Sequence, residues 1–326
     1  MSKREKEAQE TDRPVVEIAR AIDLLEAVAV HSERSLENLE SLRALPAVPY
    51  ETFLAALAAD PRGVRTRLDR VVMSDDPEIG FDALLEVGAL RAIFPEVHAM
   101  VGFGDGEWRH KDVWKHTKQV VRQATPQLEV RWAALFHDIG KVKTRSIAPD
   151  GTVHFLGHAE VGTRMFDRIN RRVGLFSSDI DDALRATIRF LVLHHLRANQ
   201  YDRGWTDSAV RRFARELGEH LPELFCLSRA DITTKRPEKK RRGIEQLDDL
   251  QARIAKLAEE DARVPPLPSG VGNEIMSAFG LKPSRLVGTI KQQLEEAIAK
   301  GEIEGHQPIE VYVDFVRGNR ERFGIS

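Results

Sequence analysis

The middle of the chain contains the run Trp132-Ala133-Ala134-Leu135-Phe136-His137-Asp138-Ile139-Gly140-Lys141. Five apolar residues lead directly into a histidine and an aspartate, so the polar pair lies at the mouth of a buried helix. Polar groups so close to an apolar stripe are costly to bury without partners. Ligation of a metal ion would supply those partners, because imidazole and carboxylate groups are common ligands of divalent ions.

The segments around this run have the periodicity of amphipathic helices. Apolar residues recur at intervals of three and four in the segments Asp112–Ala124, Leu128–Asp138, Ala159–Arg172 and Asp181–Leu196. Strict alternation is limited to two weak strand candidates, Thr152–Phe155 and Ile309–Phe315. The sequence therefore predicts an all-α protein, a helical bundle with flanking helical N- and C-terminal modules.

Proline and charge patterns divide the chain into three regions. Residues 1–100 are a helical N-terminal region that several prolines cut into short helices. Residues 101–235 carry nearly all the histidines, and residues 236–326 form a basic helix and a C-terminal helical tail. Pro265-Pro266-Leu267-Pro268 predicts a stiff connector within this last region, because proline fixes φ and disfavours helix in the residue before it.

Composition excludes several classes of protein. The 49 basic and 51 acidic side chains give a formal charge of −2, so non-specific coating of nucleic acid is not expected and any RNA contact must be local. Cys226 is the only cysteine, which rules out an internal disulfide and a cysteine-rich zinc site. No apolar stretch reaches the length of a membrane span. We expect a cytoplasmic protein with no membrane partner.

Histidines and aspartates follow one another in a distinctive order. The candidate metal ligands are His116, His137, Asp138, His158, His194, His195 and Asp231. Each has a simpler explanation when taken alone: a hydrogen-bonded histidine for His116, a helix terminus for either aspartate, and a solvated helix end for the histidine pair. The order H, HD, H, HH, D is difficult to obtain by chance, and it favours a metal site.

This order resembles the motif of the HD superfamily of metal-dependent phosphohydrolases in its fuller, two-metal form. Further stretches resemble the C-terminal half of bacterial tRNA nucleotidyltransferases that carry an HD domain. They are Phe94-Pro95-Glu96-Val97, Lys111 to Thr117, Ala230 to Lys235 and Gly272 to Gly288. By this resemblance, the helical N-terminal region of the present chain, residues 1–100, is neck-like. The similarity covers about residues 75 to 305.

The resemblance implies roles for the candidate residues. One divalent ion is expected on His116, His137, Asp138 and Asp231, and a second is expected to share Asp138 and to use His158 with His194 or His195. Asp138, Asp112 and Lys141 are the expected catalytic residues: Asp112 orients His116 or a water, and Lys141 binds a substrate phosphate. An ordinary surface carboxylate and a solvated lysine are the respective alternatives. The ligand types do not distinguish Mn, Ni, Fe, Mg and Zn.

One departure from the resembling family limits the expected activity. No Gly-Ser turn followed by paired aspartates precedes His116, and Asp179-Ile180-Asp181 is better explained as a helix N-cap. Addition of nucleotides to tRNA by this chain alone is therefore not expected. We expect a phosphodiesterase or phosphatase that acts on nucleotides or RNA 3′ ends such as 2′,3′-cyclic phosphates. The alternatives are a non-catalytic tRNA-binding module, or a partner of a separate nucleotidyltransferase head.

Two segments are candidates for contact with RNA. The basic run Lys235–Arg242 suits a phosphodiester backbone, although such a run is more often simply a solvated helix start. Trp108, Arg109 and His110 are candidates for stacking on a base or ribose, with ordinary packing as the alternative. A cyclic-dinucleotide phosphodiesterase ranks below these possibilities, because no Gly-Tyr-Pro signature lies near the histidines. A homodimer remains open.

Overall fold

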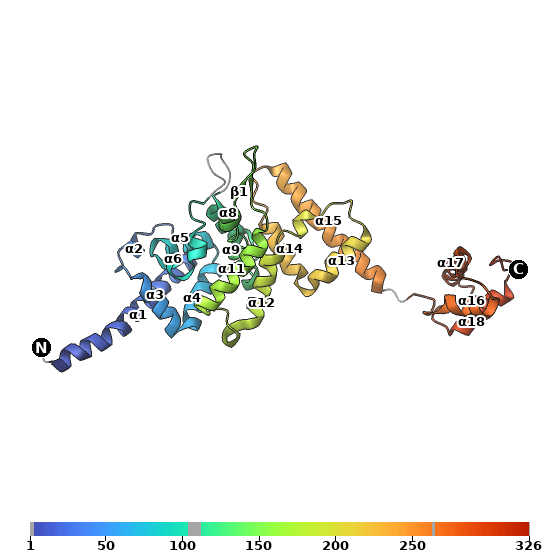
Figure 1. Ribbon diagram of the computed structural model, residues 1–326, viewed down its shortest axis with the longest axis horizontal. Coiled ribbons are helices and arrows are strands. Elements are labelled where there is room, and N and C mark those ends of the chain that lie inside the picture. The colour runs from blue at the N-terminus through green and yellow to red at the C-terminus, as the bar shows by residue number, and fades with distance from the viewer. Residues whose placement is uncertain (1–2, 104–111, 263–264, 326) are drawn as a thin grey trace. The chain divides into compact units, whose positions relative to one another are not determined.

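The structure is a computed structural model that describes residues 3–103, 112–262 and 265–325. The chain divides into two compact units, residues 1–254 and residues 255–326. Both are helical, which confirms the predicted all-α class (Figure 1). None of the described helices is both long enough and apolar enough to cross a bilayer.

One long helix, α1, and several shorter ones form the N-terminal part of the first unit. They are α1 (Lys3–Glu33), α2 (Glu40–Arg43), α3 (Tyr50–Ala59), α4 (Pro61–Met73), α5 (Pro77–Glu86), α6 (Ala89–Ile93) and α7 (Pro95–His98). Proline begins several of them, because its missing N–H is not needed in the first turn. Asp60 accepts a hydrogen bond from the Gly63 amide at 2.8 Å and so caps α4. Three of these helices, α3, α4 and α5, pack against α1.

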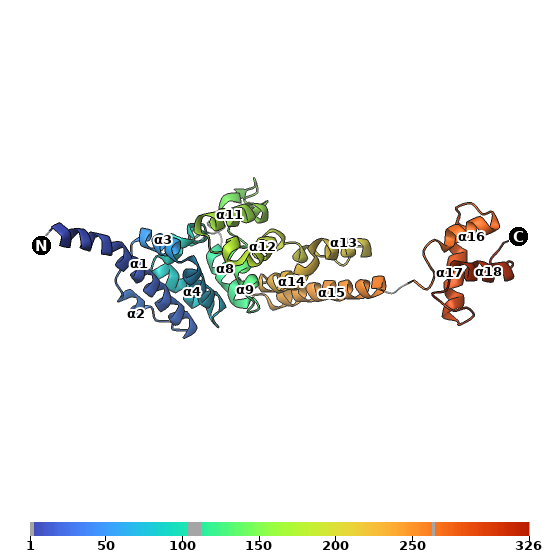
Figure 2. The same ribbon diagram turned by 90° about the horizontal axis from the view of Figure 1, so that it is seen from below.

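The central helices surround α9. They are α8 (Val113–Gln123), α9 (Leu128–Phe136), α10 (Lys141–Thr144), α11 (His158–Val173), α12 (Ser178–His194), α13 (Asp207–Leu217) and α14 (Leu221–Ala230), with single turns η1 (Ala198–Gln200) and η2 (Gly218–His220). Helix α9 contacts α4, α8, α12 and α14 (Figure 2). Every residue from Val130 to Phe136 is buried. The rings of Trp132 and Phe136 stack at 5.8 Å within this core. The end of α9, where His137 and Asp138 lie, is thereby held at the centre of the unit.

The strand predictions had different outcomes. β1 (Ser146–Ile147) and β2 (Val153–His154) form an antiparallel hairpin, which confirms the candidate at Thr152–Phe155. The candidate at Ile309–Phe315 was wrong, since these residues begin α18 (Ile309–Gly318). Tyr312, Val313 and Val316 are spaced by one and three residues, so a helix places all of them on one buried face.

Asp181 behaves as the sequence predicted. Its backbone is not helical, with φ −167°, and its carboxylate accepts a hydrogen bond from the Leu184 amide at 3.0 Å. The residue therefore caps the longer part of α12, and the N-cap explanation of the Asp-Ile-Asp sequence is confirmed for this aspartate.

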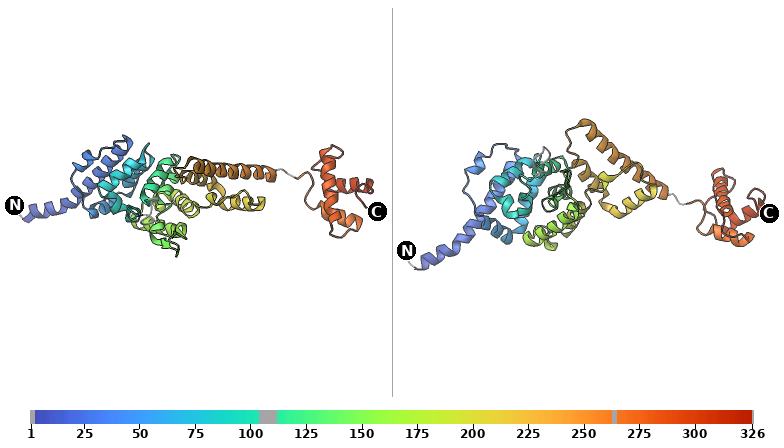
Figure 3. Two further views of the ribbon diagram at one scale, coloured as in Figure 1. Left: turned by 90° about the horizontal axis from the view of Figure 1, so that it is seen from above. Right: turned by 45° about the horizontal axis from the view of Figure 1, so that its top comes forward.

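Helix α15 (Pro237–Ala262) begins within the basic run. The two views of Figure 3 show it in orange-brown near the yellow ribbons of α13 and α14, and side-chain ion pairs join it to both. Arg229 of α14 pairs with Asp248 at 2.6 Å, and Arg253 pairs with Asp207 of α13 at 2.6 Å. These ion pairs attach the middle of α15 to the helices of the histidine-rich region.

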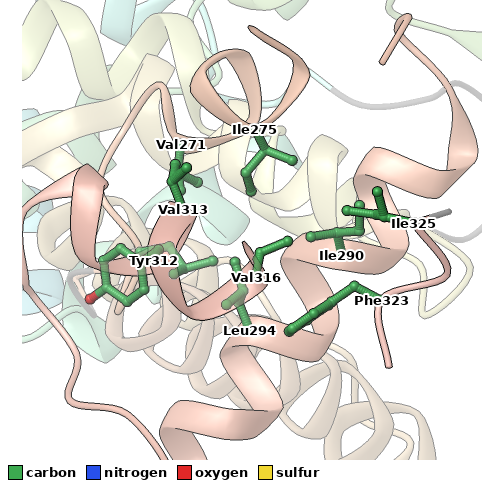
Figure 4. Packing of buried hydrophobic residues seen from close by; sticks show 10 residues of the cluster. Val271, Ile275, Ile290, Leu294, Tyr312, Val313, Val316, Phe323 and Ile325 are labelled. Carbon is green, nitrogen blue, oxygen red and sulfur yellow. The ribbon is translucent and has the colours of Figure 1, made fainter. Parts of the chain in front are cut away.

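The second unit has its own small core. Helices α16 (Val271–Phe279), α17 (Arg285–Ala299) and α18 enclose buried side chains, among them Ile275, Leu294 and Val316 (Figure 4). Tyr312 is fully buried in this core, and its hydroxyl accepts a hydrogen bond from the Gln307 amide at 2.9 Å. The same hydroxyl lies 3.1 Å from the Pro266 carbonyl oxygen and so ties the proline-rich segment to α18.

Candidate metal centre

The clustered histidines and aspartates come from the ends of five helices. His116 lies in the first turns of α8, His137 and Asp138 follow α9, and His158 begins α11. Further along the chain, one residue directly follows each of two helices: His195 follows α12 and Asp231 follows α14. Because α9 is surrounded by α8, α12 and α14, these helix ends meet at one point.

Three of the imidazoles are fixed in the same way. Nδ1 of His137, His158 and His195 lies 2.7, 2.7 and 2.8 Å from the carbonyl oxygen of the residue three positions earlier. A carbonyl oxygen can only accept, so each Nδ1 carries the proton and donates it. In the neutral imidazole each Nε2 then has a free lone pair, which is the form of histidine that binds a metal ion.

Two of these lone pairs face each other. Nε2 of His158 lies 3.2 Å from Nε2 of His195. With both protons on Nδ1, neither nitrogen can donate to the other. A separation of this size is what two nitrogens have when each lies about 2.1 Å from a common ion at an angle near 100°. Both nitrogens could therefore ligate a common ion.

Asp138 lies between two groups of histidines. Its Oδ2 is 3.4 Å from Nε2 of His116 and 3.2 Å from Nε2 of His137. Its Oδ1 is 3.5 Å from Nε2 of His158 and 4.0 Å from Nε2 of His195. Two triads of potential ligands thus share this buried carboxylate, one on each of its oxygens.

Asp231 adds a second carboxylate to the triad that contains His116. Its Oδ1 lies 3.0 Å from Nε2 of His116 and 3.7 Å from Nε2 of His137. The other nitrogen of His116, Nδ1, lies 3.0 Å from the hydroxyl of Thr233. Thr233 therefore orients this imidazole as the backbone carbonyls orient the other three.

One buried atom in this cluster is unsatisfied. Nε2 of His137 has no hydrogen-bond partner, although the side chain is fully buried and Asp138 lies within ion-pairing distance. A buried polar atom without a partner is costly. The donors are four imidazoles and two carboxylates, which is a ligand set that divalent transition metals accept. The residues therefore fit bound metal ions.

The charges of the cluster favour a cation. Burial lowers the pKa of His137, but the carboxylates of Asp138 and Asp231 outweigh burial and raise it to about 10. Burial also opposes ionisation of Asp138, yet His137 and Lys141 hold its pKa well below the usual range. Burial lowers the pKa of His195 to about 4 and lowers that of His158. At neutral pH two neutral imidazoles therefore face an ionised carboxylate.

Gly140 allows the two triads to approach each other. A Cβ atom at this position would lie 2.0 Å from the carbonyl oxygen of His158 and 2.7 Å from the amide of Gly162. Any other residue would push the start of α11, and His158 with it, away from the end of α9. The glycine after the His-Asp pair is therefore required by packing.

Lys141 lies at the edge of the cluster. Its Nζ lies 2.6 Å from Oδ2 of Asp138 and 5.6 Å from the centre of the Phe155 ring. About a fifth of the lysine side chain is exposed, so the ammonium borders both the buried carboxylate and solvent.

Two predicted site residues are placed elsewhere. Asp112 accepts hydrogen bonds from the amides of Trp114 and Lys115 at 3.0 and 3.2 Å, so its carboxylate caps α8. The ring of His194 packs against Phe190 and does not enter the cluster, whereas His195 does. The RNA-stacking candidates Trp108, Arg109 and His110 lie outside the described residues.

Sequence reasoning missed two residues of the centre. Thr233 lies in the segment singled out around Asp231, but a threonine carries no signal of its own in such a segment. Phe155 supplies the carbonyl oxygen that fixes His158 and a ring near Lys141. Its main-chain role depends on where the loop before α11 turns, which the sequence does not reveal.

Residues 113–236 match the family model of the HD domain. These residues therefore form an HD domain, as the order of the histidines and aspartates predicted. It is 32% identical over 258 residues to the A-adding tRNA nucleotidyltransferase of Deinococcus radiodurans, an alignment that covers 77% of this chain and 57% of that protein. It is also 32% identical over 273 residues to the CC-adding tRNA nucleotidyltransferase of Thermus thermophilus, covering 82% of this chain and 59% of the relative.

A third relative matches a shorter part of the chain. The multifunctional CCA protein of Shewanella denitrificans is 29% identical over 133 residues, which is 39% of this chain and 31% of that protein. The chain spans less than three fifths of the length of each of these relatives that it matches. The resemblance to tRNA nucleotidyltransferases that carry an HD domain is confirmed.

Proposed function

We propose that this chain is a metal-dependent phosphohydrolase, a phosphodiesterase or phosphatase that acts on nucleotides or RNA 3′ ends such as 2′,3′-cyclic phosphates. The observation that carries the proposal is the position of Asp138, whose two oxygens face two separate groups of histidines. A carboxylate shared in this way suits a two-ion site, a type found in many phosphatases and nucleases.

The proposed ligands divide between two ions. His116, His137, Asp138 and Asp231 hold the first, and Asp138, His158 and His195 hold the second. When bound, divalent ions acidify water and neutralise the charge of a phosphate, and hydrolysis requires both effects. The identity of the ions stays open among manganese, nickel, iron, magnesium and zinc.

Side chains that border the ligands have their own proposed roles. Lys141 contacts a substrate phosphate, because its ammonium borders both Asp138 and solvent. Asp112 acts indirectly: by capping α8 it fixes the turn that carries His116. His194 is assigned to packing, since its ring lies against Phe190.

A second function is supported by the comparisons. The relatives are named as A-adding and CC-adding tRNA nucleotidyltransferases, and the matched part includes the HD domain. The chain could therefore serve as a tRNA-binding module, or as a partner of a separate nucleotidyltransferase head, without hydrolytic activity. tRNA is in either case the substrate or partner class that the relatives suggest.

Hydrolysis assays distinguish the two functions. The purified chain, reconstituted with each of the candidate metals in turn, is assayed on 2′,3′-cyclic AMP, 2′-AMP, bis-p-nitrophenyl phosphate and tRNA. The phosphohydrolase proposal expects metal-dependent turnover of at least one of these substrates. His195→Ala should abolish that turnover, whereas the adjacent His194→Ala is the matched control and should retain it. Binding of tRNA without turnover under any metal would favour the second function.

A further inference from the structure

A cavity of about 570 Å³ lies beside the metal centre. Asp231 and Thr233 line the wall that it shares with the centre, and both of them contact His116. The lining also includes Arg236, which precedes α15, and Lys239 and Arg242 from the N-terminal part of that helix. Its volume falls in the range of ordinary small-molecule sites. A ligand held here would therefore touch the first group of metal ligands at one end and a basic helix face at the other.

Arg236 directly precedes α15, Lys239 and Arg242 lie in its first turns, and all three are exposed and available to a ligand. Lys239 and Arg242 are spaced three residues apart, so the helix brings them to the same side, and Arg236 lines the same cavity. Among the residues that the structure describes, no ion pair involves any of the three side chains. The neighbouring Arg241 differs, because it pairs with Glu238 at 2.8 Å and with Glu245 at 2.5 Å and does not line the cavity.

The rest of the lining suits a nucleoside. Leu247 and Ala198 contribute apolar surface, and the amide side chains of Asn199 and Gln246 can hydrogen-bond to a base. Gly243 is also part of the lining, and a Cβ there would lie 3.1 Å from Cδ1 of Ile232. The glycine thus lets α15 lie close to the segment that follows Asp231.

The negative charges of the lining do not cancel this basic face. Glu238 is mostly exposed and is paired with Arg241, so its charge is already compensated. Asp231 faces His116 and His137 and is assigned to the first ion. The excess positive charge therefore faces the part of the cavity that is away from the metal centre.

We propose that this cavity binds the last internucleotide phosphodiester of an RNA 3′ end, with Arg236, Lys239 and Arg242 on its phosphate, while the terminal phosphate lies at the metal centre. The inference rests on the proposed function, because it assigns the substrate of the same site. It implies that the chain prefers an RNA end with at least two nucleotides over a free mononucleotide. Two negatively charged groups are recognised. The metal centre holds the terminal phosphate, and the guanidinium and ammonium groups hold the internucleotide phosphate.

The test isolates the charge of the internucleotide linkage. Two dinucleotides are compared, each ending in a 3′-phosphonate that cannot be hydrolysed: one has a phosphodiester linkage, and the other has an uncharged methylphosphonate linkage. Their dissociation constants are measured by calorimetry on the full chain at several salt concentrations. The proposal expects the charged dinucleotide to bind about tenfold more tightly at low salt. Its salt slope should be steeper by about 0.7, the contribution of one phosphate on a single strand.

Variants locate the effect on α15. Exchange of both Arg236→Gln and Arg242→Gln should reduce the tenfold preference to about equal binding, while Arg241→Gln should leave it unchanged. Equal affinity for the two dinucleotides in the unmodified chain would overturn the proposal, as would the same loss of preference in Arg241→Gln. Hydrolysis of 2′,3′-cyclic phosphates is measured separately. A preserved charge preference without any hydrolysis would reject the proposed function and retain the phosphate site.

Discussion

Replacement of Gly140 by alanine should damage both folding and metal binding. The added Cβ would lie 2.0 Å from the His158 carbonyl oxygen, and real Cβ contacts are essentially never shorter than 3.0 Å. The end of α9 and the start of α11 must therefore separate by at least about 1 Å, which is an overpacking change of the kind that costs about 1–3 kcal/mol of stability. His158 would move with α11, away from Asp138 and His195.

The displacement predicts an unequal effect on the two proposed ions. The ion held by Asp138, His158 and His195 should bind about 10- to 100-fold more weakly, a loss typical of misplaced ligand orientation. The ion on His116 and His137 should be affected less. Denaturant unfolding with the metal chelated measures the stability, and calorimetric titration with manganese measures the two affinities.

Gly162→Ala is the matched control for this prediction. Gly162 lies across the same contact, but its added Cβ would lie 3.4 Å from the Gly140 amide, at the edge of normal van der Waals distance. Because Gly162 lies inside α11, alanine there should be neutral or stabilising by up to about 1 kcal/mol. The reasoning is refuted if Gly140→Ala unfolds at the same denaturant concentration as the unmodified chain and binds manganese with unchanged affinities.

Three further predictions concern the ligands. Elemental analysis should find two ions per unmodified chain and two in His194→Ala. It should find about one ion in His158→Ala and none in Asp138→Ala. A value that never exceeds one in the unmodified chain would reject the two-ion site. Metal binding near pH 8 should release about one proton, and affinity should increase with pH up to about 10, because the raised pKa of His137 keeps that ligand protonated until an ion displaces the proton. Calorimetry in buffers of different ionisation enthalpy measures this release, and its absence would contradict the assignment. Thr233→Val should weaken the ion on His116 by about 10- to 100-fold, because Nδ1 of His116 loses its partner, and an unchanged affinity would remove this role.

Much of the architecture could be read from local sequence patterns. The helical period of α8, α9, α11 and α12 reflects burial of one face of each helix, which is a local property of the sequence. The same rule failed at α18, where a short run with apolar residues at near-alternate positions fits either a strand or a helix. Only the packing of Tyr312 and Val316 into the small second core shows that the run is helical. For the whole chain, the sequence alone predicted an all-α protein.

The order of the histidines and aspartates by itself indicated the HD class, because residue type and order along the chain are independent of packing. The choice between His194 and His195 was not accessible, since adjacent residues on a helix point about 100° apart and only the contact of α12 with α9 selects one of them. The tertiary structure alone showed Asp112 as a cap, Thr233 as the partner of His116 and Gly140 as the close contact with His158. It also brought Arg236, Lys239 and Arg242 beside Asp231, because that neighbourhood depends on how α15 packs after the turn at residues 231–236. Such relations join atoms whose distance is set by the assembly of helices, and no local pattern encodes them.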